Sequence, residues 1–152
     1  MHQKQLEKLG IELPEYQPPA WAYQSVVQHG GVAYVSGHVA KTGDVVLHPG
    51  KVGDTVTEEQ AKEAARLATL NALASLNHAL GTLDKVRQIL KIVVFVASAE
   101  GFNRQPVVAD TVSNLLRNIF GVAGVHARSA VGVAELPRNS AVEVELIVAC
   151  EA

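Results

Sequence analysis

The chain lacks several features that define whole classes of protein. It contains a single cysteine, Cys150, so no internal disulfide framework can form. Aromatic residues make up only 5% of its 152 residues and charged residues only 18%. The longest segment without a charged residue, 16–40, contains Pro18, Pro19, Gly30 and Gly31, a composition that excludes a membrane-spanning helix. Neither a disulfide scaffold nor an integral membrane protein fits this sequence.

The short motifs of the common enzyme classes are also missing. There is no P-loop, no GxGxxG and no GxSxG, which removes the simplest nucleotide-binding and hydrolase interpretations. The six histidines stand at positions 2, 29, 38, 48, 78 and 126 and form neither an HxH nor an HExxH pair, so we expect no metal site. Cys150 has no histidine placed to activate it and is interpreted as a half-buried small residue rather than a nucleophile.

Positive charge is scarce. The formal net charge is −2 and the sequence pI is about 6.3, whereas nucleic-acid binders usually carry a basic surface. The only basic cluster, Lys85, Arg87 and Lys91, is thin, so we expect no nucleic-acid partner. The first residues show no apolar segment behind a basic start, and no secretory signal is visible. We therefore expect a cytoplasmic protein with no membrane partner.

Apolar residues make up 48% of the chain, which is enough to build an ordinary core. The first part of the chain predicts a short polar helix over 3–9, a proline-rich strap, and a hairpin over 24–36 that turns at Gly30 and Gly31. A short strand is expected at 45–47. Thr57 and Gln60 form a capping-box pattern ahead of an alanine-rich helix that ends before Gly81.

The second part of the chain alternates strand and helix patterns. It predicts a buried strand over 86–97, a helix over 106–120 and two strands over 127–134 and 141–149. This order corresponds to an α+β fold, a mixed sheet with two helices packed on one face. The other face would be left partly bare. Because another subunit is its expected cover, we predict an oligomer.

Arg128 lies in a predicted strand that otherwise consists of small and apolar residues, so its guanidinium needs a partner. Glu143 and Glu145, two positions apart, share one face of the next strand along the chain. One interpretation is an Arg–Glu pair across the sheet. The other is a fork of donors for a small carboxylate, with a nearby carboxylate to handle a proton or water. His126 adjoins Arg128 and is a candidate to face the same pocket.

These residues carry a family resemblance. HARSAVGVAELP, followed by VEVELIVA, resembles the C-terminal signature of the RidA/YjgF family of reactive-intermediate (enamine/imine) deaminases. YVSGH at 34–38, the alanine-rich helix and LKIVVFV at 90–96 agree in order and spacing, and the match covers roughly 23–149. The resemblance implies a chorismate-mutase-like fold assembled as a homotrimer, with the sheets facing inward and ligand sites between subunits. We expect a single domain over 23–152, preceded by the short helix and strap at 1–22.

The resemblance also implies roles for single residues. Arg128 would bind the carboxylate of the substrate, and Glu143 would position the attacking water. Tyr23, thirteen residues before Ser36, would close the pocket, and Ser36 would line it. No metal or organic cofactor is implied.

The chain departs from the archetypal pattern at three positions near the arginine. His126 stands where the archetypal deaminases have proline, Ala130 where they usually have cysteine, and Gly132 where they usually have glutamate. The loop at 41–54 is also longer. These differences indicate a divergent branch of the family.

Three functions follow from the resemblance. The favoured one is hydrolytic deamination of small 2-imino or enamine acids to 2-keto acids and ammonia. The alternative is a non-catalytic trimer that binds small keto acids or related carboxylate-bearing metabolites in a regulatory role. A ribonuclease, suggested by the older name of the family, is the third and is disfavoured by the charge and by the absence of paired histidines.

Overall fold

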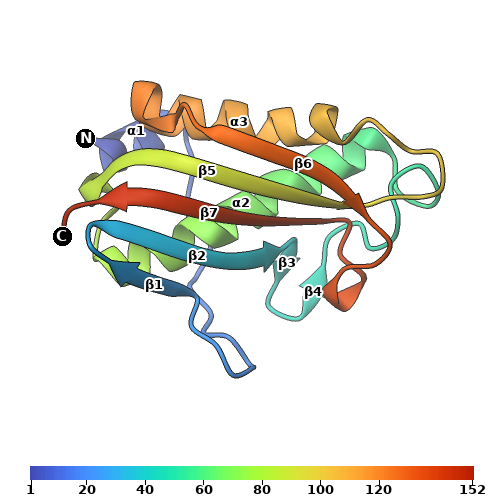
Figure 1. The fold of residues 1–152 in the computed structure, drawn as a ribbon, viewed down its shortest axis with the longest axis horizontal. Coiled ribbons are helices and arrows are strands. Elements are labelled where there is room, and N and C mark those ends of the chain that lie inside the picture. The colour runs from blue at the N-terminus through green and yellow to red at the C-terminus, as the bar shows by residue number, and fades with distance from the viewer.

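A computed structural model describes all of residues 1–152 and shows one mixed sheet backed by helices (Figure 1). The sheet has five strands in the order β1-β2-β7-β5-β6, and β3 and β4 form a separate two-stranded hairpin. The α-helices and strands are α1 (His2–Lys8), β1 (Val26–His29), β2 (Val32–Val39), β3 (Lys41–Thr42), β4 (Val45–Val46), α2 (Glu58–Leu80), β5 (Val86–Ala97), α3 (Gln105–Phe120), β6 (Ala127–Val133) and β7 (Val142–Cys150).

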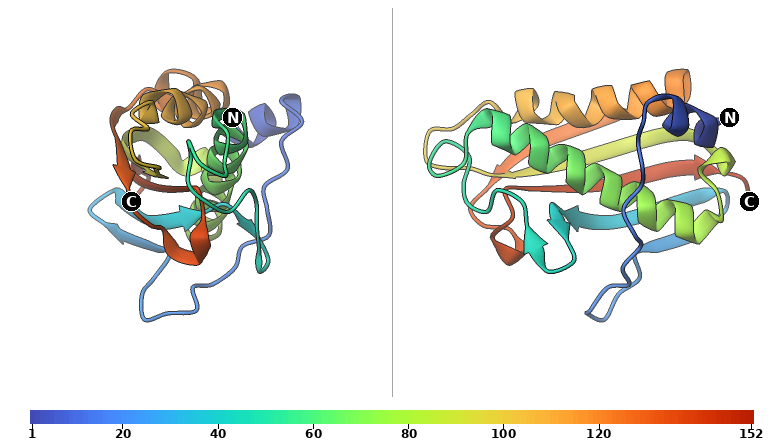
Figure 2. Two further views of the ribbon diagram at one scale, coloured as in Figure 1. Left: turned by 90° about the vertical axis from the view of Figure 1, so that its right-hand side faces the viewer. Right: turned by 180° about the vertical axis from the view of Figure 1, so that it is seen from behind.

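Only β5 and β6 run parallel, and α3 is the crossover between them; every other neighbouring pair in the sheet is antiparallel. Both long helices, α2 and α3, cover the same face of the sheet (Figure 2). The predicted α+β class, with a mixed sheet and two helices on one face, is therefore confirmed. The edges of the sheet are β1 and β6.

Helix α2 begins and ends where the sequence predicts. The backbone N–H of Gln60 donates to the Thr57 hydroxyl at 3.1 Å, and the Thr57 N–H donates to the Gln60 side chain at 3.0 Å, which completes the capping box. Gly81 ends the helix with a left-handed φ of 85°. Because small side chains let the helix lie close to the sheet, its inner face is built mainly from fully buried alanines: Ala61, Ala64, Ala65, Ala68 and Ala72.

The predicted hairpin is also present. Gly30 and Gly31 both have positive φ, 57° and 78°, as the tight turn between β1 and β2 requires. The register of β2 on β7 then shifts between Val35 and His38, where β2 bulges. The short strand expected at 45–47 is β4, which pairs with β3 in a second, smaller hairpin.

The N-terminal segment contacts the rest of the chain at several places, two of which involve ring or ionic contacts with α2 and the segment after it. The Met1 ammonium contacts Asp84 at 2.8 Å and is the main reason why the pKa of that carboxyl falls to about 2. Further along, the ring of Tyr16 stacks on His78 of α2 at 3.9 Å between centroids. The proline-rich strap therefore crosses α2 on its way to β1 (Figure 2).

No helix covers the second face of the sheet (Figure 2). On this face Val27, Tyr34 and Val131 are 53%, 50% and 42% exposed, so the prediction of a partly bare face is confirmed. The chain has no helix with the length and apolar character needed to cross a membrane.

Candidate functional site

Arg128 and Glu143 lie on opposite faces of the sheet. Strand β5 separates their strands, and the register pairs Arg128 with Ile92 and Ile92 with Leu146, all on the helix side. Glu143 pairs instead with Phe95, on the open side. The first of the two interpretations, an Arg–Glu pair across the sheet, is therefore wrong, because Glu143 and Glu145 lie an odd number of positions from Leu146 on β7 and so point to the opposite face.

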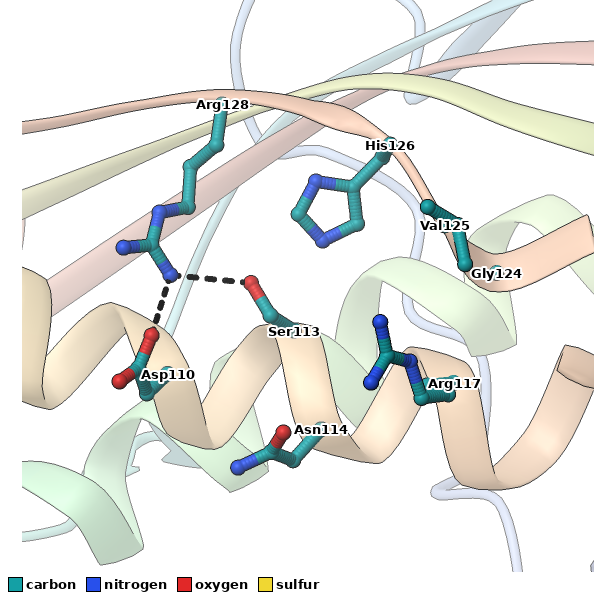
Figure 3. A pocket seen from close by; sticks show the side chains of 8 residues that line it. All are labelled: Asp110, Ser113, Asn114, Arg117, Gly124, Val125, His126 and Arg128. Atoms are coloured by element: carbon teal, nitrogen blue, oxygen red, sulfur yellow. Dashed lines mark hydrogen bonds and ion pairs between the residues drawn. The ribbon is translucent and has the colours of Figure 1, made fainter. Parts of the chain in front are cut away.

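The partners of Arg128 come from helix α3. Its Nη1 donates to Asp110 Oδ1 at 2.7 Å and to Ser113 Oγ at 3.1 Å (Figure 3). The Asp110 side chain is 65% exposed, so this ion pair is at the surface. The Nε and Nη2 atoms of Arg128 have no hydrogen-bond partner within the chain. One edge of the guanidinium is thus left free for a ligand.

Arg128 faces a polar pocket of about 300 Å³ between β6 and α3. His126 points into the same space, as its position beside Arg128 in the sequence suggested (Figure 3). Burial lowers the pKa of His126, and the charges of Arg128 and Arg117 lower it further. The pocket is lined by Asp110, Ser113, Asn114, Arg117, Gly124, Val125, His126 and Arg128.

Sequence reasoning missed the contribution of α3. Its pocket-lining residues, Asp110, Ser113, Asn114 and Arg117, are spaced i, i+3, i+4 and i+7, which places them on one helix face. The polar face of this helix can be recognised in the sequence. Its role as a pocket wall could not be predicted, because the spacing of residues in a helix does not show which strand lies beside it.

The side chain of Gln105 fills the space next to Gly132, the position where the archetypal deaminases usually have glutamate. Ala130 and Gly132 follow Arg128 on the same side of β6. A Cβ at Gly132 would lie 2.7 Å from Gln105 Nε2. The amide of Gln105 donates to the carbonyl of Phe102 at 2.9 Å and so is held in this space. A glutamate at 132, as in the archetypal deaminases, would require Gln105 to move.

Glu143 lines a separate and much larger groove of about 1000 Å³. The strap, the open face of the sheet and the β3–β4 hairpin form its walls, and Tyr23 and Glu145 line it as well. Glu145 therefore shares the face of Glu143, as the alternation along β7 predicted. Residues 41–44, from the long loop, also line the groove.

Gly37 makes room for the Glu143 side chain. A Cβ at Gly37 would lie 2.8 Å from Glu143 Cδ, so only glycine lets the carboxylate rest against β2. Burial is the main cause that raises the pKa of Glu143, and the charge of Glu145 adds to it. A raised pKa makes this carboxylate a stronger base.

Ser36 is not among the residues that line the groove. Its hydroxyl donates to the carbonyl of Gln24 at 2.6 Å, which holds the chain just before β1 against β2. His38, which sequence reasoning did not assign, lines the groove instead. Its Nδ1 lies 2.6 Å from the carbonyl of Ser36 and its Nε2 2.7 Å from Ser75 Oγ. Burial lowers its pKa, so the neutral ring bridges β2 and α2.

The raised pKa of Glu143 predicts a pH dependence of stability. Because the folded protein binds this proton more tightly than the unfolded chain does, the free energy of unfolding should fall as pH rises through the interval from the unfolded to the folded pKa. Glu143→Gln should remove that fall and stabilise the protein at neutral pH. Urea unfolding between pH 4 and pH 8 measures it. Glu12→Gln, at an exposed position, is the control and should leave the profile unchanged.

Comparison with known proteins agrees with this architecture. Residues 3–150 match the model of the YjgF/chorismate mutase-like endoribonuclease family. The chain is 40% identical to Protein TCP17 of Trypanosoma cruzi over 144 residues, 94% of this chain and 90% of that one. It is 29% identical to a 2-iminobutanoate/2-iminopropanoate deaminase of Dermatophagoides farinae, over 93% and 95% of the two chains.

A solved structure has the same fold as this chain. The protein Atu1372 of Agrobacterium tumefaciens, of unknown function, superposes with a TM-score of 0.91 at 36% identity and covers 99% of this chain and 92% of its own. The family match spans nearly the whole chain, and the sheet order, the two helices and the HARSAVGV strand all lie within it. The chain belongs to the RidA/YjgF family.

Proposed function

We propose that this protein hydrolyses small 2-imino acids, or their enamine tautomers, to 2-keto acids and ammonia. The relative named as a 2-iminobutanoate/2-iminopropanoate deaminase supports the reaction class. The observation that carries the proposal here is the free Nε–Nη2 edge of Arg128, a residue in the wall of a polar pocket. A guanidinium edge binds a carboxylate through two parallel hydrogen bonds, and this geometry suits the carboxylate of an imino acid.

Glu143 is the base in the proposed reaction. Its carboxylate takes a proton from water as the water oxygen adds to the carbon of the protonated imine, and the C=N π electrons move to nitrogen. Glu143 returns this proton to the nitrogen of the carbinolamine. Ammonia then leaves with the C–N electron pair, while the hydroxyl proton passes back to Glu143 and on to the ammonia. The elements of water are added and one ammonia is released, without a cofactor.

The opposite orientation of Arg128 and Glu143 favours a site formed between two subunits. Since Arg128 and Glu143 point away from each other across the sheet of one chain, a single substrate can contact both only if they come from different copies. We propose a homotrimer in which the open faces of the sheets point inward, so that the exposed Val27, Tyr34 and Val131 become buried. Each site would then lie between two subunits.

Hydrolysis of 2-iminopropanoate tests this proposal. The imine is generated in situ by an amino-acid oxidase acting on alanine, and the fraction that escapes hydrolysis is trapped with semicarbazide. We expect the wild type to accelerate its loss and Arg128→Ala to lower kcat/KM about 100-fold, the scale of a lost charged hydrogen-bond pair. Arg66→Ala, at an exposed position on α2, is the control. Equal rates for wild type and Arg128→Ala would contradict the proposal.

One observation favours a second function. The Gln105 amide occupies the space beside Gly132 where the archetypal deaminases carry a glutamate, so part of the usual polar lining is missing near Arg128. A site that binds a keto acid without turnover fits this difference. Binding of pyruvate that Arg128→Ala abolishes, in the absence of any imine hydrolysis, would establish this second function.

A further inference from the structure

Aromatic side chains gather in the groove that Glu143 lines. The chain has only one tryptophan, three tyrosines and three phenylalanines, yet four of these residues line this groove: Tyr16, Trp21, Tyr23 and Phe95. The ring of Tyr16 is stacked on His78, but neither Trp21 nor Tyr23 stacks on another ring of the chain. Trp21 is 78% exposed and Tyr23 is 50% exposed. The groove therefore presents aromatic surface that the fold of the chain does not use.

Two of these aromatic residues belong to the strands or segments that border Glu143. Strands β5 and β2 are the neighbours of β7 in the sheet. On β5, Phe95 is the register partner of Glu143 and points to the same open face. On β2, the Ser36 hydroxyl donates to the carbonyl of Gln24 at 2.6 Å, which holds the end of the strap at this strand, and Tyr23 is the residue before Gln24. A molecule in contact with the Glu143 carboxylate thus has aromatic residues on both sides of it.

Trp21 extends this aromatic lining along the strap. The Tyr23 N–H donates to the carbonyl of Trp21 at 2.9 Å, so the two residues share a tight turn in the loop ahead of β1 (Figure 1). The groove has a volume of about 1000 Å³, far more than a three-carbon imino acid fills. Large exposed aromatic side chains in the wall of a cavity are typical of surfaces that bind a ligand.

We propose that the groove selects substrates with an aromatic side chain, and that Trp21, Tyr23 and Phe95 bind the ring. This rests on the proposed function: when the reacting carbon lies beside Glu143, the side chain on the next carbon occupies the groove. The substrates are then 2-imino acids of the phenylalanine and tyrosine type. In their enamine tautomers the ring is conjugated with the C=C bond, and such a flat ligand suits stacking and edge contacts with aromatic side chains.

The first experiment compares two imines and three variants. Imines of alanine and of phenylalanine are generated by an amino-acid oxidase, and hydrolysis is followed with semicarbazide for wild type, Trp21→Ala, Phe95→Leu and Val122→Ala. Trp21 is exposed, so its truncation should not affect folding, and Phe95→Leu keeps an apolar side chain on β5 while removing the ring. Val122→Ala is the control, because it truncates an exposed apolar side chain outside both cavities.

We expect the wild type to hydrolyse the phenylalanine imine with a kcat/KM at least about 10-fold above that for the alanine imine, because the benzyl group adds apolar contact in the groove. Trp21→Ala and Phe95→Leu should each lower kcat/KM for the phenylalanine imine by about 5- to 10-fold, with less than about a 2-fold effect on the alanine imine. Val122→Ala should change neither. A wild type without this preference, or a preference that survives both substitutions, would overturn the inference and leave the proposed function intact.

The second experiment uses Trp21 as a reporter, since it is the only tryptophan of the chain. Quenching of its fluorescence by acrylamide is measured with 3-phenyllactate, which carries a ring and a carboxylate, and with lactate, which lacks the ring. We expect 3-phenyllactate to shield Trp21 from acrylamide and lactate to leave the quenching unchanged. A Trp21 that is already shielded in the ligand-free protein would overturn the inference, because the indole would then pack against another subunit.

The two proposals fail in different ways. If the wild type hydrolyses neither imine but 3-phenyllactate shields Trp21, the deaminase function is wrong and the aromatic groove stands as a binding site. If 3-phenyllactate and lactate both leave the quenching of Trp21 unchanged, the aromatic site is wrong whatever the turnover.

Discussion

Glu143→Gln is expected to lower kcat for imine hydrolysis by about 10²–10⁴-fold, the contribution of one positioned general base. Glutamine keeps the shape of the side chain beside Gly37 but cannot accept a proton from water. Binding of pyruvate, which depends on Arg128 in the proposed site, should remain within about 2-fold of wild type because the carboxylate anchor is untouched. Steady-state kinetics and calorimetry on the same preparations separate the two effects.

Glu145→Gln is the matched control for this prediction. Removing the negative charge of Glu145 lowers the pKa of Glu143, so the acidic limb of the kcat profile should move to lower pH while activity near neutral pH is kept. A kcat that survives in Glu143→Gln would show that another group handles the proton. An acidic limb that stays in place in Glu145→Gln would show that it reports a group other than Glu143.

Mixing two inactive variants should restore activity. Arg128→Ala and Glu143→Gln each disable every site of their own oligomer. In a cyclic assembly formed from equal amounts of both, a site that takes its arginine from one subunit and its glutamate from the next is intact with a probability of about one quarter. We therefore expect about 25% of wild-type activity after the two are co-refolded, although each alone is nearly inactive.

The register of β6, β5 and β7 is the reason for this expectation, since it turns the two side chains to opposite faces of one sheet. The control is the same mixture without denaturation, in which subunits have not exchanged and activity should stay low. A co-refolded mixture that remains as inactive as its components would show that the site uses both residues from one chain, and the proposed assembly would be wrong. Analytical ultracentrifugation of the mixture confirms that oligomers have re-formed.

Local chemistry made much of the fold predictable. The Thr57–Gln60 capping box, the Gly81 stop and the Gly30–Gly31 turn act over a few residues, so their effect can be read without tertiary contacts. The alternation along β7 in the same way predicted that Glu143 and Glu145 share a face away from the buried valines. The interpretation that failed, a pair between Arg128 and Glu143 or Glu145, assumed that strands consecutive in the chain are neighbours in the sheet.

The sequence by itself thus determined the long helices, the main strands, the Gly30–Gly31 turn and the two faces of β7, because these depend on periodicity and on backbone preferences. Only the tertiary structure decided that β5 lies between β6 and β7, that Arg128 therefore faces α3, and that Asp110, Ser113 and Arg117 join it there. It also brought the strap and the β3–β4 hairpin over Glu143. Such arrangements depend on long-range packing, whose free energy is shared among residues far apart in the chain and leaves no local pattern to read.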